Sequence, residues 1–411
     1  MYRWRSLTIL SDTWAPLRVA IECLSMPTVG SGASRLETLM LMRCNEFLGH
    51  SDTFTPYGQR MVGGIPFAAL MGTSNDYAHV RYRPLPKLRN ISLVGVHLNW
   101  GDFHDYTLGA SLGIPNCIQS LDLSQHCREV RPTCDEFAQI LKVCPLLRKL
   151  TITVSGPRFD EGVRPSGRPA SLPLLEELHV GYTSAEDAAL LLSQINAPNL
   201  VTLSIDDANH IASPGDEDAG PLLTYCATGF DLCEVLTEAP ENLVIKPPFP
   251  QLERLSLNSV NACIHPLRLL MATLLKLRHL SLHHTQNALL ALLPIQMPSA
   301  DASTRTIPYP CPGLESIEIS CSDEQTRQVL DFVLGMREQS GATRVRNVDM
   351  RLEVCSADVE DSEEIGEFQI VEGNTGMLHR YGEWELGGGD PFAPGGVFND
   401  PEFDEIYHLV S

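Results

Sequence analysis

The sequence predicts an α/β solenoid, with short parallel strands on one side and helices on the other. Two observations support this: a six-residue apolar frame that recurs along the chain, and helical spacing of apolar residues between its occurrences. The clearest frame is Leu147-x-x-Leu150-x-Ile152. Each frame alternates apolar and polar residues, as a short strand with one buried face should.

Eleven frames occur, and their first residues lie 32, 52, 30, 29, 28, 25, 52, 25, 37 and 31 residues apart. A period of roughly 20–29 residues with L-x-x-L-x-L is the leucine-rich-repeat signature. Residues 1–354 are therefore expected to form a leucine-rich-repeat horseshoe, with strands on its concave face and helices on its convex face. Each 52-residue step holds either a degenerate frame or a long insertion. The frames are Trp4-Leu7-Ile9, Leu36-Leu39-Leu41, Leu88-Ile91-Leu93, Ile118-Leu121-Leu123, Leu147-Leu150-Ile152, Leu175-Leu178-Val180, Leu200-Leu203-Ile205, Leu252-Leu255-Leu257, Leu277-Leu280-Leu282, Leu314-Ile317-Ile319 and Val345-Val348-Met350.

Four helices are predicted between frames from apolar residues three and four apart and from capping signals. They are a helix through Leu17, Ile21 and Leu24 that Pro27 stops, a helix through Phe137, Ile140 and Leu141 opened by Thr133-x-x-Glu136, a helix over Ala185–Ile195 capped by Ser184, and a helix through Val329, Phe332, Val333 and Met336 that ends near Gly341.

Irregular segments interrupt the frames at about residues 45–84, 207–249 and 286–312. Residues 355–411 form an acidic, Gly-rich tail that we expect to be partly disordered. From Glu353 onward there are 15 acidic residues and one basic residue, Arg380, so 15 − 1 = 14 of the 21 net negative charges lie there. Phe368-x-Ile370 and Trp384-x-Leu386 are candidate strands that could cap the end of the sheet.

The overall composition argues against nucleic acid or an anionic membrane as the main partner, because the chain is acidic and has no basic stripe. No apolar run approaches the ~20 residues of a membrane span. The 12 cysteines include no C-x-x-C pair. Cys44, Cys144 and Cys311 keep step with the frames, which indicates small buried packing residues and a reducing cytoplasm or nucleus.

No enzyme motif emerges, and we expect no cofactor and no metal. His283-His284 and His97 with His104-Asp105 are the densest imidazole groups, but neither has partners at metal-ligand spacing. P-loop and G-x-G-x-x-G sequences are absent from the chain, and the one G-x-S-x-G spacing, Gly109-Ala-Ser-Leu-Gly113, does not follow directly on a strand-like frame. A polar wall supplies Ser, His and Asp side chains without any catalytic purpose.

The candidate binding surface consists of the residues between the buried frame positions, which face the other side of each strand. They are small and hydroxylated, with acids and histidines toward the C-terminal half, and this composition suits a polar protein partner. Crowding between parallel strands also favours Ser and Thr there. The predicted partner-binding residues are Asp122, Thr151, His179, Ser204, Asp206, Ser256, Asn258, Ser281, His283, Glu318 and Asp349.

The runs 85–100, 131–150 and 172–180 resemble the repeat region of the large F-box/leucine-rich-repeat group of mushroom-forming fungi. The resemblance covers about residues 1–354. It implies a substrate receptor, in which an N-terminal F-box binds the Skp-type adaptor of a cullin ubiquitin ligase while the horseshoe holds the protein substrate.

The sequence departs from that plan at its start, since no F-box precedes the frame at Trp4 and no polar capping unit is present. A truncated gene model with its F-box upstream is the expected reason. Two alternatives stay open: a binding scaffold without a ligase role, and a GTPase-activating horseshoe. The second would need an exposed loop Arg or Asn at a nucleotide, and the sequence nominates none.

Overall fold

The fold is described from a computed structural model, which divides the chain into one compact unit over residues 1–353 and a second over residues 354–411. All described residues lie in the first unit: 3–26, 32–44, 49–60, 63–71, 73–76, 79–82, 85–110, 116–159, 167–211, 218–229, 246–285, 288–293, 309–321 and 324–352. The predicted acidic tail and its two candidate strands lie outside these ranges.

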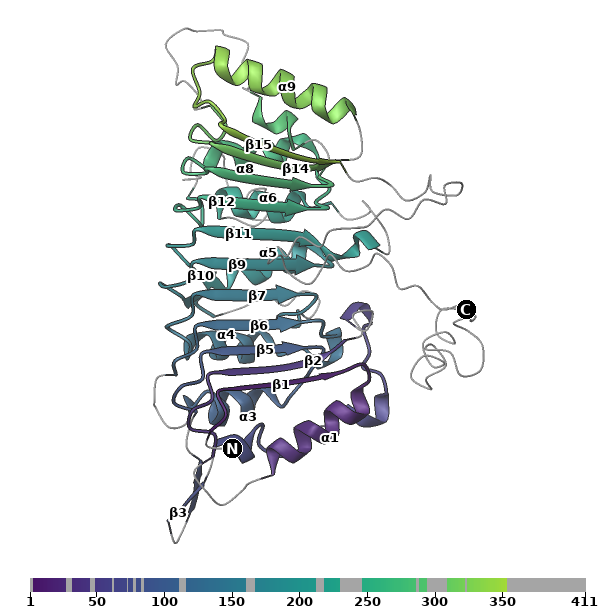
Figure 1. The fold of residues 1–411 in the computed structure, drawn as a ribbon, viewed down its shortest axis with the longest axis vertical. Coiled ribbons are helices and arrows are strands. Elements are labelled where there is room, and N and C mark those ends of the chain that lie inside the picture. Colours follow the sequence, from purple (N-terminus) through teal and green to yellow (C-terminus); the bar gives the residue numbers. More distant parts are fainter. Residues whose placement is uncertain are drawn as a thin grey trace, which may run out of the picture. The chain divides into compact units, whose positions relative to one another are not determined.

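The first unit is an α/β structure built on an eleven-stranded sheet in which every neighbouring pair is parallel (Figure 1). The strands lie side by side in chain order, and each contains the second and third residues of one of the eleven frames, so the predicted strand positions are confirmed. They are β1 (Ser6–Ser11), β2 (Thr38–Arg43), β5 (Asn90–Val94), β6 (Ser120–Ser124), β7 (Lys149–Thr153), β9 (Glu177–Tyr182), β11 (Thr202–Asp207), β12 (Arg254–Asn258), β13 (His279–His283), β14 (Ser316–Cys321) and β15 (Asn347–Leu352).

Both 52-residue steps are insertions within one crossover. β2 pairs directly with β5, and β11 pairs directly with β12, so neither step adds a strand to the large sheet. The first insertion contains helix α2 (Ala68–Met71), whose residues are all buried, and the separate antiparallel hairpin of β3 (Thr73–Asp76) and β4 (His79–Tyr82). Another two-stranded pair, β8 (Ala170–Ser171) with β10 (Ile195–Asn196), is parallel.

Burial follows the frames. In the nine interior strands the second and third frame residues are buried, as Leu150 and Ile152 of β7 illustrate. In β1 the equivalent residues Leu7 and Ile9 are only partly buried, because the strand has a neighbour on one side alone. The core is therefore continuous along the sheet and thins at its ends, as expected when each unit packs only on its neighbours.

A backbone device repeats at the amino-terminal edge of the sheet. In every frame but the last, the residue that follows the first frame position accepts two hydrogen bonds through its backbone carbonyl. The donors are two consecutive backbone N–H groups at the start of the next strand. The Arg148 carbonyl, for example, accepts from Glu176 and Glu177 at 2.8 and 2.9 Å. This bonding connects all eleven strands. The side chains at this position nearly alternate in charge, and Arg148 and Glu176 form an ion pair at 2.5 Å. The edge row is Arg5, Glu37, Arg89, Gln119, Arg148, Glu176, Val201, Glu253, Arg278, Glu315 and Arg346.

The helices in the middle of the chain lie on one face of the sheet, behind the strands in Figure 1, and the first and last helices lie next to the two ends of the sheet. The prediction that Thr133 and Glu136 open a helix is confirmed by a complete capping box, and Ser184 accepts from the Asp187 N–H at 3.3 Å as a helix cap. Besides α2, the described helices are α1 (Trp14–Ser25), α3 (Trp100–Asp102), α4 (Cys134–Lys142), α5 (Ala185–Ser193), α6 (Gly220–Thr228), α8 (Ile264–Thr273) and α9 (Glu324–Gln339).

One residue of the predicted face of the last helix is wrong, while Val333 is buried and Val329 and Met336 are partly buried as predicted. Phe332 of α9 is 57% exposed, whereas Leu330, Val333 and Arg337 are buried. The guanidinium of Arg337 donates at 2.8 Å to the carbonyls of Pro310 and Cys311, which fixes this face of α9 against the segment before β14. A buried cation is acceptable there because carbonyl oxygens replace its water. Hydrophobic spacing alone does not reveal such a contact.

One described part of the first insertion, residues 49–60, packs onto neighbouring segments. The ring of Phe54 lies 5.1 Å from that of Trp14 and 4.3 Å from that of His97, measured between centroids. The Trp14 indole donates to the Gln59 carbonyl at 3.2 Å, and Arg60 forms an ion pair with Glu129. Residues 49–60, which belong to the irregular segment 45–84, therefore contribute to the packing of the fold.

The nine cysteines whose side chains the structure describes are all free thiols. Cys144 and Cys311 are fully buried, as their place in the frames predicts, and burial raises the pKa of each thiol to about 12. Cys44 is exposed, so its predicted packing role is wrong. It follows the last residue of β2, where the chain has already left the core.

Several strands end in a left-handed backbone turn. The residue after β5 is Gly95, with φ 62°, which glycine adopts without strain. At the same position after β6, β7, β12 and β13 stand Gln125, Val154, Ser259 and His284, with φ between 48° and 59°. Such a conformation costs a non-glycine residue about 1–3 kcal/mol and persists only where the surroundings hold it.

Candidate functional site

The side of the sheet opposite the helices carries the predicted partner-binding row. Pairing places one residue of each strand in a single row across all eleven strands: Thr8, Met40, Ser92, Asp122, Thr151, His179, Ser204, Ser256, Ser281, Glu318 and Asp349. Every member is at least partly exposed. We call this row and its surroundings the polar face; eight of the eleven predicted residues lie in the row itself.

Near one end of the row, Asp122 is engaged by its neighbours. Its carboxylate accepts from the Ser92 hydroxyl at 2.8 Å and from the Ser124 hydroxyl at 2.5 Å. Burial raises the pKa of Asp122, and the two hydroxyl donors oppose that rise. With its acceptor sites used inside the sheet, Asp122 serves the fold at least as much as any partner.

A second row is formed by the residues two positions further along each strand, and one predicted contact residue in it, Asp206, is wrong. Asp206 is 1% exposed and accepts from the Asn258 amide at 2.7 Å, so it lies beneath the surface and cannot meet a partner directly. The physical reason is that this row approaches the loops that close the strands. Asn258 and His283 in the same row remain partly exposed.

Toward the C-terminal end, hydroxyl, imidazole and carboxylate groups form a network. His283 contacts the Ser281 hydroxyl through Nε2 at 2.7 Å and the Ser320 hydroxyl through Nδ1 at 2.6 Å. Ser281 also donates to Glu318 at 3.3 Å, and Glu318 pairs with Arg351 at 3.0 Å. Because the carboxylate contacts the serine and not the far nitrogen of the histidine, the order is the reverse of a catalytic triad.

Arg351 also joins the last member of the row, Asp349, at 3.6 Å. The network therefore spans β13, β14 and β15 and holds the side chains of the last three strands together. Exposed ion pairs of this kind contribute about 0–1 kcal/mol each, so the network fixes side-chain positions more than it stabilises the fold.

The middle of the row differs from both ends. Thr151, His179, Ser204 and Ser256, on β7, β9, β11 and β12, have no side-chain hydrogen bond to another described residue. All four are partly exposed. Desolvation lowers the pKa of His179 to about 4, and the nearby Lys149 ammonium adds to the shift. At neutral pH this stretch therefore presents uncharged donors and acceptors that no described neighbour uses.

Two buried histidines lie outside the polar face, and the sequence singled out only one of them. His126 is fully enclosed: Nε2 donates to the Val96 carbonyl at 2.7 Å, and Nδ1 lies 2.7 Å from the Ser155 hydroxyl. Since a carbonyl can only accept, the ring is the neutral Nε2–H tautomer. Desolvation lowers the pKa of His126 to about 3 and that of His97 to about 4.

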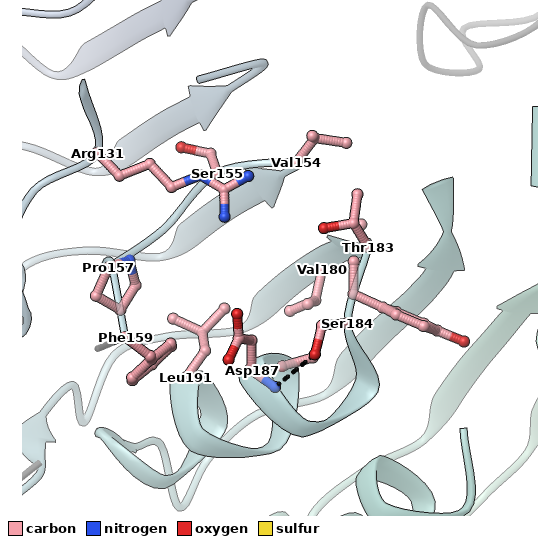
Figure 2. A pocket seen from close by; sticks show the side chains of 13 residues that line it. Arg131, Val154, Ser155, Pro157, Phe159, Val180, Thr183, Ser184, Asp187 and Leu191 are labelled. Carbon is pink, nitrogen blue, oxygen red and sulfur yellow. Dashed lines mark hydrogen bonds between the residues drawn. The ribbon is translucent and has the colours of Figure 1, made fainter. Parts of the chain in front are cut away.

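A narrow pocket opens between the carboxyl ends of β7 and β9 and the start of α5 (Figure 2). Arg131, Phe159 and Asp187 line it together with Leu191 of α5. The Arg131 side chain also donates to the His126 carbonyl at 2.9 Å, and desolvation lowers the pKa of this guanidinium. The lining comes from three distant stretches of sequence, and only the Ser184 cap beside it had a recognisable signal.

Within the described ranges, no group of three or more His, Cys, Asp or Glu residues could hold a metal ion. Nor does any helix in those ranges have the length and apolarity to cross a membrane. No protein-family model matches the sequence, and the comparison with curated proteins found no match.

Proposed function

We propose that this chain is a leucine-rich-repeat solenoid of the horseshoe type that binds another protein on its polar face. Eleven parallel strands in chain order, with helices on the opposite face, support the solenoid assignment. The polar face would then be the concave side of the horseshoe. The proposal assigns the protein no catalytic role, cofactor or metal.

One observation supports the binding site most strongly: the four adjacent residues Thr151, His179, Ser204 and Ser256 offer polar groups that no described neighbour uses. Protein interiors and interfaces pair nearly all their polar groups, so unpaired groups in a continuous row are available to a partner. Successive strands lie about 4.8 Å apart, so four strands span about 14 Å, enough for several residues of a partner.

The composition of the row also indicates the partner's character. The β1–β2 end presents Leu10 and Met40, the middle presents hydroxyls and a neutral imidazole, and the far end presents Glu318 and Asp349. A protein with an apolar anchor at one end and a polar or basic segment at the other matches this gradient.

We further propose that the partner is a substrate of a cullin ubiquitin ligase, with this chain as the recognition part of an F-box-type receptor. The support is the resemblance of residues 85–100, 131–150 and 172–180 to fungal F-box/leucine-rich-repeat proteins. A ligase-independent scaffold, in which the same face binds without an adaptor, is the alternative. The free cysteines suit the cytoplasm or nucleus in either case.

The test is affinity capture from a lysate of the source cells, with a variant that blocks the middle of the row: Thr151→Arg, Ser204→Arg and Ser256→Arg together. We expect loss of the captured proteins with an unchanged circular dichroism spectrum. The matched control carries Asp135→Lys, Gln139→Lys and Lys142→Glu on the exposed side of α4 and should capture normally. Equal capture by all three proteins would refute the binding face.

The ligase role has a separate readout. Captured material is blotted for the Skp-type adaptor and cullin, using this chain and a chain extended by the upstream reading frame of its transcript. Adaptor bound by the extended chain alone would support the receptor. If neither chain binds adaptor while the polar face still captures partners, the scaffold alternative replaces it.

A further inference from the structure

The two terminal strands of the sheet differ in how their free edges are protected. β15 carries the charged residues Asp349 and Arg351, both exposed, and charged side chains are a common protection against edge-to-edge pairing. β1 reads Ser-Leu-Thr-Ile-Leu-Ser, without charge or proline, and β2 is its one strand neighbour among the described residues. An uncharged, unprotected edge is a template for another strand.

The helix layer is also apolar at this end of the sheet. On α1, Trp14, Leu17 and Ile21 face the core, while a stripe of Ala15, Val19 and Cys23 is exposed and Met26 follows directly after the helix. Val19 is 58% exposed and Met26 61%. Leu10 of β1 is 58% exposed as well. Both layers therefore end in apolar surface at the β1 end, which favours a protein contact there.

The hydrogen-bonding direction of each β1 residue follows from its bonds to β2. The carbonyl of Arg5 accepts from Glu37 and Thr38, and the carbonyl of Ser11 accepts from Cys44. Backbone groups in a parallel strand alternate sides, so odd-numbered residues of β1 bond to β2. The N–H and C=O groups of Ser6, Thr8 and Leu10 consequently face away from the sheet.

We propose that β1 pairs antiparallel with β1 of a second copy of this chain, centred on Thr8, to form a two-fold symmetric dimer. In this register Thr8 lies opposite Thr8, and Ser6 lies opposite Leu10 on both sides of the axis. Each of these three pairs joins residues whose backbone groups face outward, so each pair exchanges two hydrogen bonds. The register also keeps Leu7 and Ile9 of both copies on the helix side of the joined sheet.

Charge at the ends of β1 favours a second copy as the occupant. Arg3 and Arg5 precede the strand and Asp12 follows it, all exposed. Antiparallel self-pairing brings the basic start of one strand to the acidic end of the other, and a two-fold interface uses the same patch twice. Stacking β1 on β15 of another copy would instead place uncharged Thr8 and Leu10 against the charges of β15 and would build open filaments.

The test is sedimentation velocity of the full chain over a concentration series, where we expect a monomer–dimer equilibrium. Thr8→Pro removes one outward N–H donor per copy without touching the β1–β2 bonds, and should weaken dimerisation at least tenfold. The matched control Val348→Pro changes an outward position on β15, the opposite terminal strand, and should leave the dimer intact. Circular dichroism checks that each variant is folded.

A charge exchange tests the register. Thr8→Lys and Thr8→Glu should each be monomeric, because like charges meet at the two-fold axis, and an equimolar mixture should recover a heterodimer in native mass spectrometry. A chain that is monomeric at every concentration would overturn the proposal, as would open-ended polymers or a dimer that Val348→Pro breaks and Thr8→Pro does not.

Discussion

Acid should destabilise this protein through His126, and the size of the effect follows from its surroundings. The imidazole is enclosed, and its pKa is lowered from 6.5 to about 3 by desolvation. Between pH 6.5 and pH 3 the imidazole binds a proton in the unfolded chain but not in the folded chain. The contribution of His126 to stability is therefore fully present above pH 6.5 and is lost as pH falls toward 3. Each pH unit in that window costs about 1.4 kcal/mol, so lowering the pH from 7 to 5 removes about 2 kcal/mol.

The assay compares the wild type with His126→Gln, whose amide can donate to the Val96 carbonyl but does not titrate. Urea unfolding at pH 7, 6 and 5, followed by circular dichroism, gives the free energy of unfolding of each protein. The wild type should lose about 2 kcal/mol more than the variant between pH 7 and pH 5. His265→Gln, at an exposed position of α8, controls for removal of an imidazole as such.

A constant difference between wild type and His126→Gln across this pH range would refute the reasoning. It would mean that His126 binds a proton in the folded protein as readily as in the unfolded chain, and that the ring is not enclosed at Val96 and Ser155. The wild type should likewise lose more free energy of unfolding than His97→Gln between pH 7 and pH 5, since desolvation also lowers the pKa of His97, to about 4.

Four further substitutions test the packing and the helix ends. Gly181→Ala places a Cβ 2.6 Å from a methyl of Thr153 and should lower the free energy of unfolding by about 1–3 kcal/mol. Gly335→Ala in α9 meets nothing within 4 Å and should raise the free energy of unfolding by about 1 kcal/mol. Equal effects of the two substitutions would contradict the close contact between Gly181 and Thr153. Thr133→Ala removes the cap of α4 and should cost about 1 kcal/mol in urea unfolding, and no change would show that the capping box is unimportant. Leu150→Asp buries an unpaired charge and should unfold the neighbouring strands, seen as lost hydrogen-exchange protection in β6 and β9; native protection there would refute it.

The strands were predictable because the apolar and polar positions within each frame show which of its residues are buried. Leu150 and Ile152 alternate with Thr151, and this two-residue period is enough to place a strand and its buried face without knowledge of its neighbours. The parallel register then follows from aligning the frames, which is why the row from Asp122 to Asp349 was predicted residue by residue. The capping box at Thr133 was predictable for the same local reason.

Contacts between distant segments were not predictable. His126, the Arg337 contact with the segment before β14 and the packing of Phe54 on Trp14 each join residues more than 25 positions apart in the sequence. Asp206 shows the limit within the site itself: the two-residue period places it correctly on the polar face, but its burial depends on surrounding segments that the frame does not describe.

The alternating charges of the amino-terminal edge restrict how such a chain can gain or lose length. Arg278, Glu315 and Arg346 occupy successive strands, so deletion of the unit that contains Glu315 would set two arginines side by side. Deleting two adjacent units would keep opposite charges as neighbours. Genetic duplication or excision is therefore better tolerated in pairs of units than singly, and this chain should accept engineered two-unit deletions more readily than one-unit deletions.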